Sequence, residues 1–290
     1  MQEVQTINQH LFTASMFIYL AASFFYIVYM AFRYQAVGEK SGKFGSLLVV
    51  LGVLIHTIAI VLRWIESYNL PGDVGHAPFS NMYESMVFFS WTVMLVYIIY
   101  EKKTKMKALG AFVAPLGFLG IAIVSLFGDF SPEISPLVPA LQSIWLEIHV
   151  ITCFIGYGAF AVAFGASIMY LIKKGQEERG GAKEGAALPP SKDLEEISYK
   201  TIAVGFPFLT AGIITGAIWA NSAWGTYWSW DPKETWSLIT WFMYAAFLHS
   251  RYTQGWRGRK MAWLSIIGFA FVVFTYWGVN FLLAGLHSYG

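Results

Sequence analysis

The chain contains eight stretches of mostly apolar residues, each near the length of a helix that crosses a lipid bilayer. They cover roughly residues 11–32, 45–65, 84–100, 108–127, 145–172, 201–220, 235–250 and 261–284. About 20 apolar residues span the hydrocarbon core as a helix, and the third and seventh stretches are the shortest. Only 12% of the 290 residues are charged. The sequence therefore predicts an all-α, polytopic membrane helix bundle of about eight transmembrane helices, with residues 1–290 as a single integral membrane domain.

The positions of the basic residues predict how this bundle is oriented. Of the 19 lysines and arginines, all but Arg63 and Lys233 follow the first, third, fifth or seventh stretch. Lysine and arginine close to span ends stay in the cytoplasm, so both termini are expected outside a cytoplasmic (inner) membrane. Residues 173–200 carry six basic and six acidic residues and are expected to form a solvated cytoplasmic linker.

The remaining composition excludes several kinds of function. The net charge of +2 is too small to indicate nucleic-acid binding. Cys153 is the single cysteine, so the chain has no internal disulfide, no CxxC redox pair and no cysteine-ligated zinc or iron–sulfur site.

Tryptophan is concentrated in one outward segment. Six of the 12 tryptophans lie between Trp219 and Trp241, around an outward loop over residues 221–236. One interpretation is an interfacial aromatic belt. The other is a flat aromatic platform for a planar ligand, with Lys233 available for an anionic substituent. Asp231 is expected as the N-cap of the next helix, with Pro232 at its first position and Glu234 at its third.

The histidines favour the platform. His149 and His287 lie at the outer ends of spans five and eight, and His249 lies near the inner end of span seven. Neutral imidazole is an axial ligand of haem iron, so His149 and His287 could hold one haem from both faces if these spans are neighbours. The alternative is that each is hydrogen-bonded within the bundle or wetted at its surface. His56 lies at mid-membrane depth, where a helix-packing hydrogen bond is the favoured interpretation.

A motif in the tryptophan-rich loop resembles a known family. It reads Trp224-Gly225-x-x-Trp228-x-Trp230-Asp231-Pro232-Lys233-Glu234-x-Trp236 and is similar to the "WWD" signature of haem-handling proteins. The Lys-Glu-x-Trp continuation resembles the CcsA/ResC branch of system II cytochrome c biogenesis. Residues 75–85 and 141–150 agree with that branch, and the resemblance extends over about residues 45–290.

The resemblance implies a function in haem delivery. Members of this family move haem b to the outer side of the membrane and present it for thioether attachment to the CxxCH motif of apocytochrome c. By this resemblance the chain is a subunit of a cytochrome c haem lyase (holocytochrome c synthase), active only with a CcsB-like membrane partner. Thiol-reducing, thioredoxin-like proteins are expected as indirect partners, since this chain has no thiol expected near the outer face.

The resemblance also assigns residues. His149 and His287 correspond to the outer axial ligands, and His249 to an inner haem site whose opposite ligand comes from the partner. The haem-contacting loop positions are Trp224, Gly225, Trp228, Trp230, Asp231, Lys233, Glu234 and Trp236. Independently of the resemblance, haem propionates need cations, and Lys233 and Arg63 are the only basic residues expected near the outer face. No catalytic residue is identified, although Asp231 and Glu234 are candidates.

Two other functions compete with this one. The first is a system I WWD protein that delivers haem to a chaperone or receives haem from one, which the Asp-Pro-Lys-Glu continuation disfavours. The second is a non-enzymatic membrane transporter or b-haem electron carrier, whose tryptophan loop is only an anchor. Inverted repeats would indicate a transporter, and histidine pairs within the same helices would indicate an electron carrier.

Overall fold

The structure is a computed structural model that describes residues 2–69, 75–126, 130–180, 188–283 and 285, and all of its regular elements are helical. The α-helices are α1 (Gln2–Ala31), α2 (Ala36–Ser67), α3 (Met82–Thr104), α4 (Gly110–Leu126), α5 (Ile144–Glu178), α6 (Ser191–Trp224), α7 (Pro232–Tyr252), α8 (Arg259–Val273) and α9 (Val279–Leu282). Short 3₁₀ turns cover Lys107–Leu109 and Pro139–Leu141. A π-helical segment, Phe274–Gly278, joins α8 to α9 and makes them one continuous span.

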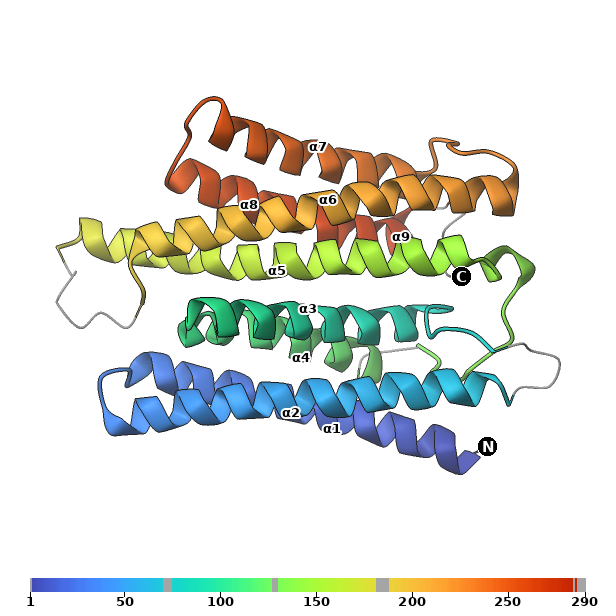
Figure 1. The fold of residues 1–290 in the computed structure, drawn as a ribbon, viewed down its shortest axis with the longest axis horizontal. Coiled ribbons are helices and arrows are strands. Elements are labelled where there is room, and N and C mark those ends of the chain that lie inside the picture. Colours follow the sequence, from blue (N-terminus) through green and yellow to red (C-terminus); the bar gives the residue numbers. More distant parts are fainter. Residues whose placement is uncertain (1, 70–74, 127–129, 181–187, 284, 286–290) are drawn as a thin grey trace.

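The long helices run in alternate directions, which sorts the loops to two ends of the bundle (Figure 1). The start of α1, the loop over residues 225–231 and the end of α9 lie at one end, here termed the tryptophan end. The loops that carry most of the lysines and arginines lie at the opposite, basic end. The segments that the sequence assigns to one side of the membrane therefore lie together.

Seven of the described helical segments are long and apolar enough to cross a membrane. The exception is α7, which has 21 residues but carries Lys233 and Glu234 in its first turn and His249 and Arg251 in its last. It packs against α6 and α8 within the antiparallel series. The expectation of a polytopic α-helical membrane bundle is confirmed, with seven rather than eight apolar spans among the described residues.

Two segments expected to be loops are largely helical. α5 continues to Glu178 and α6 begins at Ser191, so the linker expected over residues 173–200 is confined to residues 179–190. Likewise α6 ends at Trp224 and α7 begins at Pro232, so the loop expected over residues 221–236 is confined to residues 225–231. Both helices extend beyond their apolar stretches because polar residues continue a helix readily outside the hydrocarbon region.

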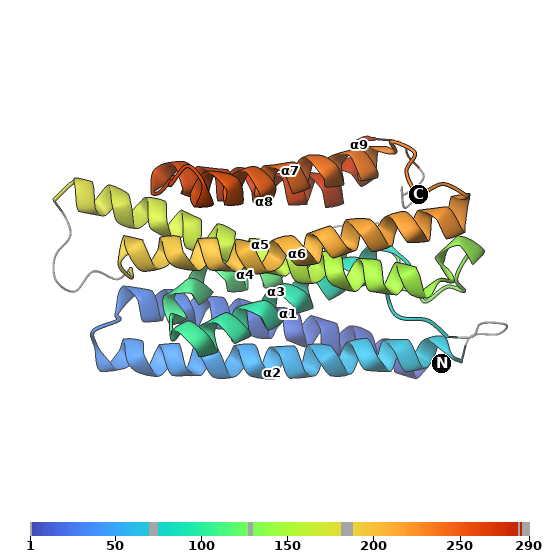
Figure 2. The ribbon, with the colours of Figure 1, turned by 45° about the horizontal axis from the view of Figure 1, so that its top comes forward.

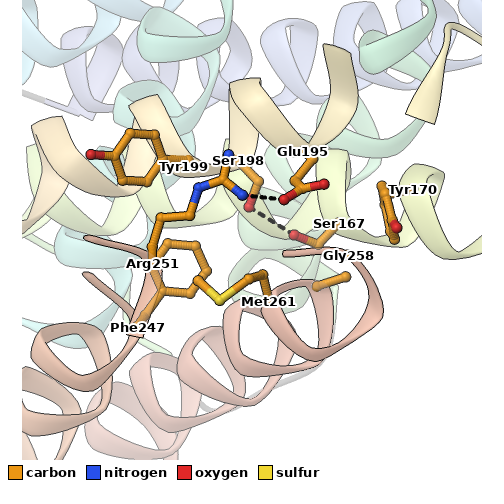
Figure 3. A pocket seen from close by; sticks show the side chains of 10 residues that line it. Ser167, Tyr170, Glu195, Ser198, Tyr199, Phe247, Arg251, Gly258 and Met261 are labelled. Carbon is orange, nitrogen blue, oxygen red and sulfur yellow. Dashed lines mark hydrogen bonds and ion pairs between the residues drawn. The ribbon is translucent and has the colours of Figure 1, made fainter. Parts of the chain in front are cut away.

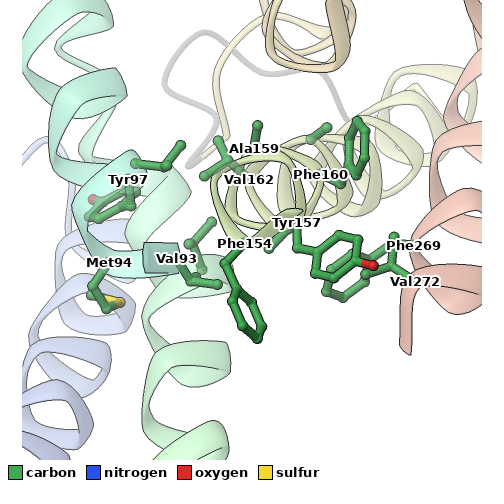
Figure 4. Close-up of a cluster of buried hydrophobic side chains, with 14 of the residues drawn as sticks. Val93, Met94, Tyr97, Phe154, Tyr157, Ala159, Phe160, Val162, Phe269 and Val272 are labelled. Carbon is green, nitrogen blue, oxygen red and sulfur yellow. The ribbon is translucent and has the colours of Figure 1, made fainter. Parts of the chain in front are cut away.

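Part of the core lies around α5, which packs against α3 on one side and against α8 on the other (Figure 4). Figures 1 and 2 show α5 and α6 side by side in the middle of the bundle, with α1–α4 on one side of them and α7–α9 on the other. Phe160 of α5 stacks on Tyr244 of α7 with ring centroids 3.6 Å apart. Small residues let helices approach closely in a membrane. A Cβ atom at Gly156 would lie 3.1 Å from the Gly205 carbonyl oxygen, so α5 and α6 approach closely there.

His56 lies in the α1–α2 interface, far from any loop. Its side chain is fully buried, and its Nδ1 lies 3.2 Å from the Tyr19 hydroxyl of α1. Phe12 contacts the same ring edge-to-face at 5.5 Å. The helix-packing hydrogen bond expected for His56 is confirmed.

Candidate functional site

A cavity of about 570 Å³ opens at the tryptophan end of the bundle. Its walls come from the start of α3, residues 135–141, the first turns of α5, the last turns of α6, the tryptophan-rich loop, the start of α7 and the π-helical segment of the last span. Sites of about 300–1,000 Å³ lined mainly by apolar and aromatic groups are typical of ligand and cofactor pockets. The cavity therefore has the size and lining of a small-molecule site.

His149 projects into this cavity from α5. Ser143 caps the helix, and its hydroxyl accepts a hydrogen bond from the Trp145 backbone N–H. His149 Nδ1 lies 2.7 Å from the Gly212 carbonyl oxygen of α6, a group that only accepts hydrogen bonds. Nδ1 therefore carries the proton, which leaves Nε2 as the metal-binding nitrogen. Trp219 stacks on the ring at 6.1 Å and fixes its plane further.

The tryptophan-rich loop turns sharply between α6 and α7. Gly225 ends α6 with a φ of 78°, a left-handed conformation in which a side chain is strained. Asp231 accepts a hydrogen bond from the Lys233 backbone N–H at 2.9 Å, and Glu234 accepts one from the Asp231 backbone N–H at 3.2 Å. This is a capping box with Pro232 in the first turn, so the helix start expected at Asp231 is confirmed.

The cavity receives only part of the expected aromatic platform. Trp224 and Trp228 line it, together with Trp219. Trp230 is 69% exposed and makes an edge-to-face contact with Trp228. Trp236 packs on Phe274, with ring centroids 4.2 Å apart. Trp230 and Trp236 are therefore not lining residues. The loop directs the Trp230 side chain outward, and Trp236 lies on the face of α7 that packs against Phe274.

Among the other residues of the loop motif, some line the cavity and others do not. Lys233 and Glu234 line the cavity, and Lys233 Nζ lies 3.0 Å from Asn280 Oδ1 of α9. Gly225 and Asp231 shape the backbone and are not among the lining residues.

The expectation that Arg63 binds an anionic ligand group is wrong. Its side chain is 1% exposed and is not part of the cavity wall. Its Nε lies 2.7 Å from Glu84 Oε1, and its Nη1 donates a hydrogen bond to the backbone carbonyl of Pro132. Lys233 is thus the only cation among the described lining residues.

Of the three proposed ligand histidines, the described residues place only His149 at the cavity. His249 lies near the basic end of α7, with its side chain exposed and away from the cavity. His287 lies outside the described residues. Gly285, two residues earlier, lies against Asp231 and Pro232 at the start of α7. α5 and α8 are neighbours, which is the condition for His149 and His287 to share a ligand.

Sequence reasoning missed several lining residues. Cys153, one helical turn after His149, lies in the wall with its Sγ 3.7 Å from His149 Nδ1, so the expectation of no thiol near this face is wrong. Tyr276 also lines the cavity, and its hydroxyl lies 2.5 Å from that of Ser85. The π-helical turn that carries Tyr276 has no sequence signature, although such turns are frequent at functional sites.

A second, much smaller cavity of about 10 Å³ lies at the basic end (Figure 3). Arg251 forms an ion pair with Glu195, and the hydroxyls of Ser167 and Ser198 lie 2.9 Å apart. The volume suits about one water molecule. This cavity is therefore too small for a cofactor.

Fold and cavity together define a multi-pass membrane protein with a ligand-sized, aromatic cavity at one end. Residues 79–287 match the family described as Cytochrome C assembly protein. The chain is 42% identical to cytochrome c biogenesis protein CcsA of Guillardia theta, over 83% of each chain, and 39% identical to CcsA of Gloeobacter violaceus, over 93% of this chain and 92% of that one. The chain therefore belongs to the CcsA family of cytochrome c biogenesis proteins, and the resemblance to that branch is confirmed.

The fold also matches a solved structure, that of cytochrome c heme lyase CcmF. The TM-score is 0.68 at 15% identity, over 94% of this chain and 46% of that one. This chain thus spans about half of that protein, and the likeness concerns the helix bundle alone.

Proposed function

We propose that this chain holds haem b in the cavity at the tryptophan end and presents it to the CxxCH motif of apocytochrome c. It would act as the CcsA-like subunit of a cytochrome c synthase. The observation that carries the proposal is the position of His149, which projects into a cavity of about 570 Å³ with Nδ1 already hydrogen-bonded. The tryptophan end would then face the outer side of the cytoplasmic membrane.

The lining residues fit haem as cargo. A histidine whose Nδ1–H is held by a carbonyl has the orientation and basicity of an axial ligand. Trp219, Trp224 and Trp228 supply flat apolar walls, and Lys233 supplies a cation for one propionate. We assign the opposite axial position to His287, since Gly285 lies beside the start of α7.

Thioether formation joins the haem vinyl groups to the two thiols of the CxxCH motif. The contribution of this chain would be to bind, orient and shield the porphyrin: His149 and His287 hold the iron, the tryptophan walls set the ring plane, and Lys233 selects which edge lies deep. Thioredoxin-like proteins would keep the acceptor thiols reduced. Glu234 and Asp231 hold the loop through the capping box and need take no part in bond formation.

We assign His249 to a separate inner site shared with a CcsB-like subunit. Its exposed position near the basic end of α7 is accessible to a neighbouring helix. The second axial ligand would come from the partner subunit, as the family resemblance implies. The complex would then hold haem at two depths.

The proposal is tested by the absorption spectrum of the chain purified with its CcsB-like partner. We expect a low-spin, six-coordinate haem b spectrum, because two imidazoles would hold the iron. A complex that carries no haem when produced in haem-replete cells, or carries only high-spin haem, would contradict it.

Loss of the cavity cation should weaken binding. In Lys233→Met, the affinity for haem should fall by about 10- to 100-fold, since a charge-assisted hydrogen bond is lost. Lys233→Arg should retain most of the affinity. Lys200→Met, which removes an exposed lysine at the basic end, is the matched control. Equal haem titrations for Lys233→Met and Lys200→Met would exclude a propionate contact.

Loss of His249 should reduce the delivery of haem from the inner side, and it should leave haem binding at the outer cavity unchanged. His249→Ala should lower the total haem per complex, while haem added to the purified complex should still give the low-spin outer spectrum. The measurement is haem content by pyridine haemochrome before and after that addition. Unchanged haem content would remove the basis for an inner site at His249.

A further inference from the structure

A buried ion pair lies behind the wall of the cavity. Arg63 of α2 and Glu84 of α3 are 1% and 2% exposed, and Arg63 Nε lies 2.7 Å from Glu84 Oε1. Neither residue lines the cavity. Replacing such pairs by well-packed apolar residues is often neutral or stabilising, so stability alone does not explain a buried pair.

The carboxylate holds one wall of the cavity. Glu84 Oε2 accepts hydrogen bonds from the Ser80 backbone N–H at 2.8 Å and from the Ser80 hydroxyl at 2.6 Å. The Asn81 side chain in turn caps α3 by accepting from the Glu84 backbone N–H at 2.9 Å. Ser80 and Asn81 are lining residues, and their backbone is thus fixed by groups outside the cavity.

The guanidinium holds a second part of the wall. Arg63 Nη1 donates to the Pro132 carbonyl at 2.8 Å, and Nη2 donates to the Glu133 carbonyl at 3.3 Å. The chain that follows supplies lining residues Ser135, Pro136, Leu137, Val138, Ala140 and Leu141. Because most of residues 130–143 have no regular secondary structure, their position depends on such anchors.

The far end of this wall is bonded to the tryptophan that stacks on the histidine we assign to haem. The Ala140 carbonyl accepts a hydrogen bond from Trp219 Nε1 at 2.8 Å, and Trp219 stacks on His149. Residues 130–143 are therefore held at one end by Arg63 and at the other by the tryptophan beside His149.

We propose that Arg63 is a positioning residue, which uses three hydrogen bonds from one guanidinium to set these two parts of the cavity wall at a fixed separation. A planar guanidinium presents its donors in a rigid fork that holds a carboxylate and two carbonyls in fixed relative positions, whereas an ammonium has only three donors on a flexible stem and imposes no such geometry. That Arg63 positions the cavity wall follows from the contacts above. The expected effect on haem binding rests on the proposed function.

The single cysteine provides a test that needs no haem. Cys153 lies in the cavity wall and is 7% exposed, so its reaction with a small methanethiosulfonate reagent reports opening of the walls. In haem-free full-length chain, co-purified with its partner, Arg63→Met should label at least about tenfold faster than the parent, because charged hydrogen bonds to the loop are lost. Arg63→Lys should also label faster, although it keeps the charge.

Two controls separate positioning from stability. Glu101→Gln changes another buried carboxylate of α3, at the basic end, where Glu101 accepts from Tyr26 and Ser46, and it should leave the labelling rate unchanged. The double variant Arg63→Met/Glu84→Met removes both buried charges and should regain thermal stability relative to Arg63→Met, yet still label fast. Cys153→Ser must abolish labelling.

The outcomes are decisive in either direction. Parent-like labelling in folded Arg63→Lys and in the double variant would overturn the proposal, as would equal acceleration by Glu101→Gln. If labelling accelerates as expected but haem titration of the parent shows no binding, the positioning role stands and the haem assignment fails.

Discussion

His149→Ala is expected to remove the outer haem from the purified complex. The variant loses the one described imidazole that projects into the cavity, so haem affinity should fall by more than about 100-fold, beyond the effect of changing a residue that only supports a ligand. The measurement is the absorption spectrum at equal protein concentration. Added imidazole should restore a low-spin spectrum, because the truncated side chain leaves room for a free ligand beside Trp219.

The matched control for this substitution is His10→Ala, which removes an exposed histidine of α1 that does not line the cavity. It should retain the parent spectrum and cytochrome c maturation. The double variant His149→Ala/His287→Ala should lose maturation completely and should not regain it with imidazole. If that double variant kept its outer haem and still matured cytochrome c, both ligand assignments would be wrong.

Gly216→Ala is expected to weaken haem binding although it replaces no proposed ligand. A Cβ atom at position 216 would lie 2.6 Å from His149 Nδ1, well inside contact distance, so the imidazole must rotate. Rotation breaks the hydrogen bond from Nδ1 to the Gly212 carbonyl, which sets the proton position and the ring plane. Loss of such a supporting bond typically costs about 10- to 100-fold in metal affinity.

Gly175→Ala is the control for this substitution, since a Cβ atom there would meet no other atom within 4 Å. It lies on α5, like His149, but towards the basic end. Helix content should be unchanged or slightly higher in both variants, because alanine has the higher helix propensity. Parent-like haem titration of Gly216→Ala would show that the Nδ1 hydrogen bond does not contribute to binding.

The helix bundle was largely predictable because its signals are local. Apolar length sets the spans. The long helix that is too polar to count as an apolar span, α7, carries Lys233 and Glu234 in its first turn and His249 and Arg251 in its last. The start of α7 at Pro232 was equally predictable, since a cap depends on the chemistry of three or four consecutive residues. The helix ends that lie beyond the apolar stretches were less predictable. No local sequence signal ends α5 at Lys173 or begins α6 at Thr201.

The site was predictable in its residue types more than in its geometry. The grouping of Trp224, Trp228 and Lys233 with His149 follows from loop orientation and is present in the cavity. The outward direction of Trp230 depends on a φ of 61° at that residue, and no sequence pattern predicts this backbone conformation for a tryptophan. Arg63 looked available for an anion because its partners, Glu84 and residues 132–133, are distant along the chain.

The sequence by itself determined the membrane class, the gathering of the basic loops at one end of the bundle and the family, since these depend on composition and on short motifs. Only the tertiary structure decided which side chains share the cavity, that Cys153 and Tyr276 belong to its wall, and that Arg63 lies behind it. The physical reason is that the rotation of each helix about its axis follows from packing against its neighbours. A residue's face, and thus its chemistry, is settled by those contacts rather than by its place in the chain.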